Sequence, residues 1–174
     1  MTFSIRRLGR DDADAYRAIR LEALTSHPDA FASTAENFVR YSLQDLEALL
    51  EKVVFFGAIA ADGSLAGIMA FDPGEGREAH RGWLLQVYVQ GRLRGTGCAQ
   101  ALLDAIMTYA AGHVLQVHLG VASHNETAIR LYQKAGFEIY GTDHRFQFVN
   151  GRYVDEHLMV RFLDKAPGKK TDNE

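Results

Sequence analysis

Short runs rich in Val, Ile, Leu and Phe recur along the chain, and turn-forming residues bound most of them. Such runs are typical of β-strands, whose extended backbone accommodates branched and aromatic side chains. The dipeptides Asp62-Gly63 and Asn150-Gly151 each separate two runs, and both favour the tight turn of an antiparallel hairpin. The pattern predicts strands at residues 3–8, 53–60, 65–71, 83–89, 114–121, 145–149 and 153–161, with a further strand starting at 137–140.

Other segments place apolar residues three or four positions apart, the spacing of one helix face. Asp11 is positioned to cap the first of these segments, and Ser42 and Asp45 have the spacing of a capping box at the second. Gly112 and Gly136 terminate the last two. The predicted helices cover residues 13–24, a segment that follows Ser42, residues 98–111 and residues 125–135.

The order of these elements predicts a mixed α+β domain. We expect a single, mostly antiparallel sheet of about seven strands flanked by about four helices, with a βαβ unit in its second half. The domain should occupy residues 1–163. Residues 164–174 lack apolar periodicity and are expected to form a flexible C-terminal tail.

Composition narrows the class of protein. A chain of 174 residues with 47% hydrophobic residues can build the core of one domain. Its net charge of -3 gives no basic excess for nucleic acid or an anionic membrane. Without a signal-like N-terminus or a long apolar run, we expect a cytoplasmic protein. Cys98 is the only cysteine and the histidines are scattered, so we expect no internal disulfide and no metal site.

A glycine-rich segment, Arg92-Leu93-Arg94-Gly95-Thr96-Gly97, lies between a predicted strand and a predicted helix. The free amides and positive dipole of a helix N-terminus favour a phosphate group, so the segment fits a pyrophosphate. It is not a Walker A loop, because Cys98 follows Gly97 where that loop has lysine. Nor is it a dinucleotide fingerprint, which needs a third glycine where Gln100 stands. A tight turn without a ligand stays open as the alternative.

A second segment runs from Asn125 through Ala128, Tyr132 and Gly136 to Phe137. The pattern Arg-x-x-Gly-x-Gly followed by Asn-x-x-Ala-x-x-x-Tyr-x-x-x-Gly-Phe resembles the coenzyme A site of the GCN5-related N-acetyltransferase (GNAT) superfamily. The resemblance extends over residues 3–162. It implies the GNAT fold and transfer of an acetyl group from acetyl-coenzyme A to a primary amine, by direct attack in a ternary complex and without a metal.

The resemblance also assigns a coenzyme site. It implies that backbone amides from Arg92, Leu93, Arg94, Gly95, Thr96, Gly97 and Cys98 surround the pyrophosphate, with added charge from the two arginines. Main-chain groups of Val87, Tyr88 and Val89 would bind pantetheine.

The second motif completes that site. The Asn125 side chain would contact the pantetheine arm beside Ala128, and the Tyr132 hydroxyl would face the coenzyme sulfur as general acid. Two alternatives stay open. Asn125 can cap its helix, and Cys98 can be a small buried hydrophobe rather than a nucleophile.

The acceptor site is less constrained by the sequence. Glu36 and Glu156 are candidates for accepting the amine proton, with solvated carboxylates as the alternative. Alternation along a strand prevents Glu156 and His157 from facing the same site. Since these walls carry carboxylates, including Asp155, we expect a cationic amine. A small molecule is favoured, with a peptide or protein amine, or an acetyl-coenzyme A sensor without turnover, as alternatives. The protein would act as a monomer or homodimer.

Overall fold

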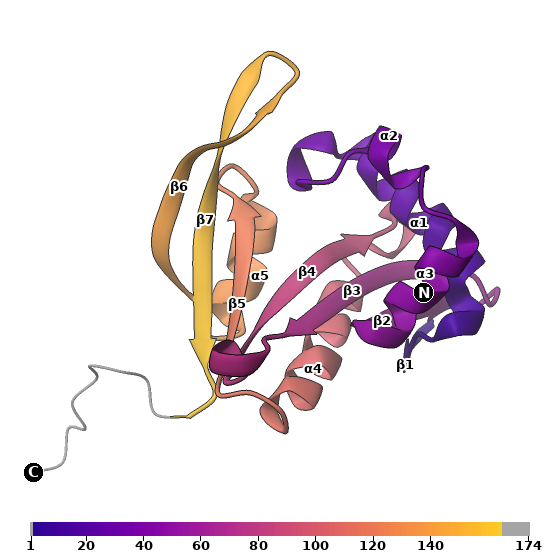
Figure 1. Cartoon of the computed structure of the whole chain (residues 1–174), viewed down its shortest axis with the longest axis horizontal. Helices are drawn as coiled ribbons and strands as arrows, with labels where there is room; N and C mark the ends of the chain where they lie inside the picture. The colour runs from indigo at the N-terminus through magenta and orange to yellow at the C-terminus, as the bar shows by residue number, and fades with distance from the viewer. Residues whose placement is uncertain (1, 165–174) are drawn as a thin grey trace, which may run out of the picture.

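The computed structural model describes residues 2–164, which contain a seven-stranded sheet of order β1-β2-β3-β4-β5-β7-β6 (Figure 1). All neighbouring strands are antiparallel except β4 and β5, which are parallel. The mixed, mostly antiparallel sheet predicted from the sequence is therefore confirmed. The predicted tail, apart from Asp164, lies outside the described residues. The strands are β1 Phe3–Arg7, β2 Val54–Ala60, β3 Leu65–Pro73, β4 Arg81–Val89, β5 Gln116–Ala122, β6 Glu138–Val149 and β7 Arg152–Phe162.

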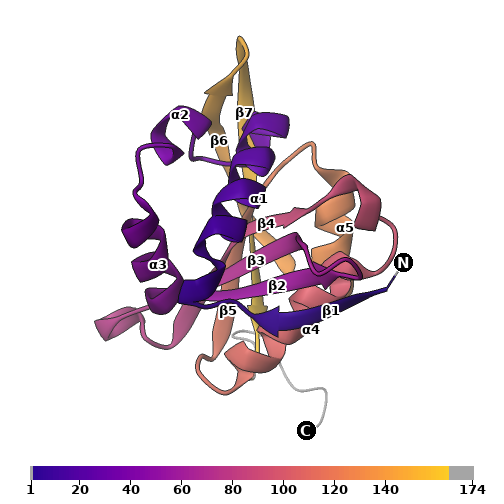
Figure 2. The same cartoon turned by 90° about the vertical axis from the view of Figure 1, so that its right-hand side faces the viewer.

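Helices cover both faces of the sheet (Figure 2). On one face α1 and α3 bury apolar side chains against β2 and β3, with Tyr16 and Phe55 in edge-to-face contact at 5.1 Å. On the other face Leu102 and Ile106 of α4 pack in a second cluster with Val117 of β5. The helices are α1 Ala13–Ser26, α2 Ala35–Phe38, α3 Leu43–Lys52, α4 Cys98–Ala111 and α5 Glu126–Lys134.

Helix starts agree with the sequence in one case and differ in another. Ser42 Oγ accepts a hydrogen bond from Asp45 N at 3.1 Å, and the Asp45 carboxylate accepts one from Ser42 N at 2.8 Å, so the predicted capping box is confirmed. The predicted cap at Asp11 is wrong. A 3-10 turn, Arg10–Asp12, leads directly into α1, and the Asp12 carboxylate accepts from Gly9 N at 2.9 Å.

The two hairpin turns form where predicted, with positive φ at Gly63, Asn150 and Gly151. The segments predicted at 137–140 and 145–149 are parts of one strand, β6. Its pairing with β7 is irregular between Asp143 and Gln147, which explains why the apolar pattern breaks there. The short helix α2 was not predicted, because four residues are too few to show helical periodicity.

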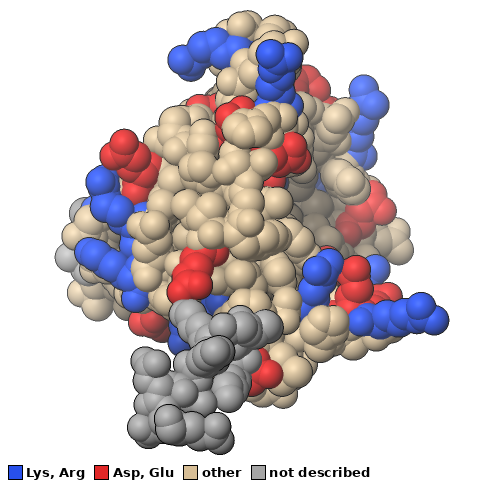
Figure 3. All heavy atoms as spheres, turned by 90° about the vertical axis from the view of Figure 1, so that its left-hand side faces the viewer, with Lys and Arg blue, Asp and Glu red and all other residues tan. Residues whose placement is uncertain are grey.

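Charged groups on the face formed by β6 and β7 lie mainly around its edges (Figure 3). The middle of this view carries few Lys, Arg, Asp or Glu side chains, and both signs occur around the rim.

Within residues 2–164, no helix is both long and apolar enough to cross a membrane.

Candidate active site

The parallel strands β4 and β5 separate toward their carboxyl ends (Figure 1). They pair only where Arg81–Leu84 lies beside Gln116–Leu119. Beyond this stretch β4 continues along β3 as far as Val89, whereas β5 continues along β7. The opening at the C-terminal end of parallel strands is a common place for a ligand in sheets of this kind.

A β-bulge distorts β4 at this opening. Leu85 pairs with Ala70 and Tyr88 with Ile68, so both Gln86 and Val87 oppose the single residue between those partners. Gln86 has a φ of 52°, which is uncommon for a residue other than glycine. The Tyr16 hydroxyl donates to Gln86 Oε1 at 2.7 Å and holds the bulge against α1. Bulges of this kind re-aim side chains beside functional sites.

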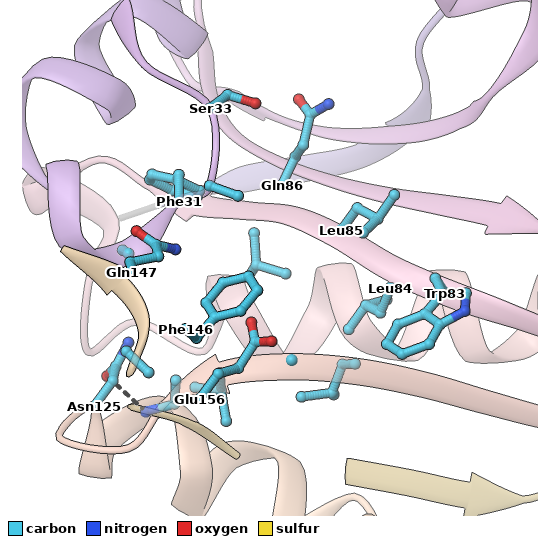
Figure 4. Close-up of a pocket in the computed structure, with 18 of the residues that line it drawn as sticks. Phe31, Ser33, Trp83, Leu84, Leu85, Gln86, Asn125, Phe146, Gln147 and Glu156 are labelled. Atoms are coloured by element: carbon cyan, nitrogen blue, oxygen red, sulfur yellow. Dashed lines mark hydrogen bonds between the residues drawn. The ribbon is translucent and has the colours of Figure 1, made fainter. Parts of the chain in front are cut away.

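Two cavities meet at the opening. The first, which we call the loop cavity, has a volume of about 680 Å³ and extends past Tyr88 to Arg94 and α5. The second, the strand cavity, has a volume of about 420 Å³ and lies over the separated strands (Figure 4). Residues that line both cavities are Ala30, Phe31, Val87, Ala122, Asn125, Ala128 and Tyr132.

The glycine loop presents backbone amides at the start of α4. Gly95 and Gly97 have φ values of 73° and 85°, and no atom within 4 Å would meet a Cβ on either residue. The first helical hydrogen bond runs from Ala101 N to Gly97 O at 3.0 Å. The amides of residues 98–100 therefore have no helical acceptor and are available to an anion. Thr96 Oγ1 donates to Leu93 O at 2.6 Å and closes the loop.

The two arginines of the loop have different surroundings. Arg94 lines the loop cavity, where its Nε donates to Val89 O at 3.0 Å. Arg92 points to the turn between β2 and β3, where it pairs with Asp62 at 3.1 Å and donates to Ser64 Oγ at 2.6 Å. Of the predicted pair, the structure brings only Arg94 to the cavity.

Tyr132 of α5 lies where the two cavities meet and is 4% exposed. Its ring contacts Phe137 edge-on, with centroids 5.9 Å apart. Burial raises the pKa of the Tyr132 hydroxyl well above its ordinary value, so the group stays protonated at neutral pH. The site thus contains a buried hydroxyl that can donate a proton.

Asn125 begins α5 and also lines both cavities. Its Oδ1 accepts a hydrogen bond from Ala128 N at 3.2 Å, drawn as a dashed line in Figure 4, which confirms the capping interpretation. Capping uses the side-chain oxygen and leaves the side-chain NH₂ group as a donor toward a ligand.

Glu156 of β7 projects into the strand cavity beside Phe146 (Figure 4). Burial, and then the nearby charge of Asp143, raises the pKa of the Glu156 carboxyl. His157, the next residue, lies elsewhere and contacts Thr142 Oγ1 through Nδ1 at 2.9 Å. The two side chains thus alternate as the strand pattern predicts.

The structure does not bring the other acceptor candidates into the strand cavity. Glu36 is exposed and lines a separate hollow of about 620 Å³ beside the tip of β6. The Asp155 carboxylate accepts from Arg145 N at 2.9 Å and contacts His144 at 2.8 Å. Within residues 2–164, no group of three His, Cys, Asp or Glu side chains is placed to hold a metal ion.

Cys98 is buried in the first turn of α4 and lines neither cavity. Burial raises the pKa of its thiol, which favours the unreactive protonated form. The interpretation of Cys98 as a small buried hydrophobe fits this environment.

Arg20 is a cavity residue that the sequence reasoning missed. It belongs to α1, is 4% exposed and lines the strand cavity. Arginine on an amphipathic helix ordinarily lies on the solvent side. A signal was nevertheless present, because Arg20 shares the helix face of Tyr16, Ile19 and Ala23, which are all buried.

Comparisons with known proteins identify the family. Residues 5–158 match the model of the acetyltransferase (GNAT) domain. An uncharacterized N-acetyltransferase of Mycobacterium tuberculosis is 31% identical over 147 residues, which is 84% of this chain and 86% of that protein. An L-amino acid N-acetyltransferase of Escherichia coli is 35% identical over 77 residues, 43% of this chain and 48% of that protein.

Solved structures agree with this assignment. An acetyltransferase of the GNAT family from Streptococcus pneumoniae superposes with a TM-score of 0.81 at 24% identity, covering 92% of this chain and 99% of that one. The seven-stranded sheet that separates between β4 and β5 is thus the GNAT fold, as the sequence motifs predict. The chain belongs to the GNAT family of N-acetyltransferases.

Proposed function

We propose that this protein transfers an acetyl group from acetyl-coenzyme A to the primary amine of a small molecule. The observation that carries the proposal is the junction of two cavities at Tyr132 and Asn125. The coenzyme would lie in the loop cavity and the amine in the strand cavity. The acetyl group would then be held at the junction, where both reactants can meet.

Features of the loop cavity support its assignment to the coenzyme. The free amides at the start of α4 suit a pyrophosphate, and the Arg94 guanidinium adds positive charge. The side-chain NH₂ of Asn125 and main-chain groups of residues 87–89 would bind the pantetheine arm. A bound thioester would thereby be fixed beside the strand cavity, and such positioning lowers the barrier to attack.

The residues at the junction suit direct attack. The amine nitrogen forms a bond to the acetyl carbon, and the bond from that carbon to sulfur then breaks. Glu156, directly or through water, would take the proton that the amine loses. Tyr132 would give a proton to the departing thiolate, and solvent would restore it. No covalent enzyme intermediate is needed, in keeping with the position of Cys98 outside both cavities.

A small-molecule acceptor fits the strand cavity better than a long polypeptide does. A volume of about 420 Å³ is at the lower end of the range for small-ligand sites. The name of the Escherichia coli relative, an L-amino acid N-acetyltransferase, also supports an acceptor of this size.

The test is thiol release from acetyl-coenzyme A with a panel of amines, beside thermal protection by coenzyme A alone. We expect protection together with release that depends on an amine. Protection without release from any amine would instead identify an acetyl-coenzyme A sensor. Release with a peptide amine but with no small amine would move the acceptor class to polypeptides.

A further inference from the structure

The strand cavity holds two ionisable side chains of opposite charge, Arg20 from α1 and Glu156 from β7. No ion pair within 4.0 Å joins them among the described residues. The nearby charge that perturbs the Glu156 carboxyl comes from Asp143, not from Arg20. The cavity therefore presents a separate cation and a separate anion to whatever binds in it.

The environment of Arg20 is unusual for a guanidinium group. The side chain is 4% exposed, and its buried Nη1 has no hydrogen-bond partner within residues 2–164. The guanidinium lies over the Phe31 ring, with 4.6 Å between its central carbon and the ring centroid. Arginine stays charged at neutral pH, and an unpaired buried charge is strongly unfavourable. A guanidinium in this position therefore indicates a binding site for an anionic group.

Carboxylate is the anion that fits best. A guanidinium forms two parallel hydrogen bonds with a carboxylate, a geometry that strengthens the pair and fixes its orientation. On the other side, Glu156 can attract an ammonium group and accept its proton. Trp83, Leu85 and Phe146 form an apolar part of the remaining lining, against which an apolar side chain would pack (Figure 4). Ser33, Gln86 and Gln147 add polar side chains to it.

We propose that the acceptor is an amino acid with an apolar side chain, with its carboxylate on Arg20 and its amino group toward Glu156. This proposal rests on the proposed function, acetyl transfer to a small amine. It revises the cationic amine expected from the sequence. Glu36 and Asp155 lie outside the strand cavity, so a polycation would meet Arg20 with only Glu156 in compensation.

The reaction leaves the carboxylate unchanged. The ammonium group first gives one proton to Glu156, which passes it to solvent. The free amino nitrogen then forms a bond to the acetyl carbon, and the bond from that carbon to sulfur breaks. The nitrogen loses its second proton to Glu156 or water, and Tyr132 protonates the sulfur so that the coenzyme leaves as a thiol. The product is an N-acetyl amino acid that has lost its positive charge and kept its negative one. Loss of attraction to Glu156 favours its release.

The first experiment compares amines that differ only at the carboxylate. Leucine, leucinamide and 3-methylbutylamine share a side chain, and the amines of the two controls are respectively less and more basic than that of leucine. We expect kcat/KM for leucine to exceed both controls by about 100-fold, because analogues that lack the carboxylate leave a buried charge unpaired. Equal kcat/KM values for the three amines would overturn the proposal while leaving acetyl transfer established.

The second experiment removes the guanidinium. Arg20→Met should lower kcat/KM for leucine by about 100-fold and change that for 3-methylbutylamine by less than about 3-fold. Arg20→Lys keeps the charge without the paired donors and should fall between the wild type and Arg20→Met. If Arg20→Met does not fold, the comparison of the two amines with Arg20→Lys decides the question. Equal losses for both amines would assign Arg20 a structural role and overturn the proposal.

A binding measurement separates this proposal from the proposed function. With coenzyme A bound, leucine should raise the melting temperature further, whereas 3-methylbutylamine should not. If no amine releases thiol, the proposed function fails, and leucine protection that is lost in Arg20→Met would still support the assignment of the cavity. No protection by any of several apolar amino acids would overturn it.

Discussion

The carboxylate of Glu156 lies against the main chain of Gly120, where a Cβ on residue 120 would collide with both carboxylate oxygens. Gly120 belongs to β5 and pairs with Leu158 of the neighbouring strand β7. The absence of a side chain at this one position lets Glu156 fold back over the sheet. The glycine thus determines where the carboxylate sits in the strand cavity.

Gly120→Ala should therefore reduce activity without changing the affinity for the coenzyme. The added methyl group displaces Glu156, so kcat/KM for the amine should fall by about 10- to 100-fold, below the full effect of losing a general base. Gly141→Ala is a matched control, because Gly141 lies in strand β6 and no atom lies within 4 Å of the place that its added methyl group would occupy. Steady-state kinetics decide, and an unchanged kcat/KM in Gly120→Ala would exclude Glu156 as the base.

Tyr132→Phe should separate chemistry from binding. The ring and its contact with Phe137 remain, and only the proposed proton donor is removed. We expect kcat to fall by about 10- to 1000-fold with little change in coenzyme affinity. The measurement is turnover at saturating amine, together with a thermal shift by coenzyme A. A wild-type rate would remove Tyr132 from the mechanism.

Coenzyme binding should stabilise the folded protein, by about 2.7 kcal/mol at a hundredfold excess over Kd. Gly95→Glu should abolish this protection, because a carboxylate would enter the proposed pyrophosphate site. Gly95 has a φ of 73°, so any substitution also strains the backbone. Gly151→Glu, at a φ of 77° in the distant hairpin turn, introduces similar strain and should keep the protection. Full protection of Gly95→Glu would place the phosphates elsewhere.

The sequence predicted the elements whose signals are local. The hairpin turns at Gly63 and Gly151 need positive φ, and glycine supplies it. The capping box between Ser42 and Asp45 depends on residues three positions apart. Signals of this kind can be read before any tertiary structure is known.

The composition of the strand cavity could not be read in this way. The bulge at Gln86 is held by a hydrogen bond from the Tyr16 hydroxyl, and Tyr16 is 70 positions away in the sequence. The cavity likewise brings together Arg20 of α1 and Glu156 of β7, and only packing across the sheet determines that arrangement. The sequence placed Glu36 in the acceptor site, yet Glu36 belongs to α2 and lines the separate hollow beside the tip of β6.

Glu156→Gln tests the environment of the carboxyl through stability. The folded-state pKa of Glu156 is raised above its ordinary value of 4.5, first by burial and then by Asp143, so the fold favours the protonated form. Stability from this group is fully present below pH 4.5 and decreases as pH rises through the raised pKa. Glutamine does not titrate, so the two proteins should melt at similar temperatures in acid. Near pH 8 the variant should melt higher by about 1–4 °C.

Two controls make this prediction specific. The first control repeats the comparison of Glu156 with Glu156→Gln in a protein that also carries Asp143→Asn. This substitution removes the neighbouring charge, so the difference in melting temperature should depend less on pH. The second control is melting in the presence of leucine. The pH-dependent difference in melting temperature should again become smaller, since a bound ammonium group would stabilise the ionised carboxylate. A difference in melting temperature that stays constant from pH 4 to pH 8 would mean that Glu156 titrates as a solvated carboxyl. Its assignment as the group that accepts the amine proton would then lose its physical basis.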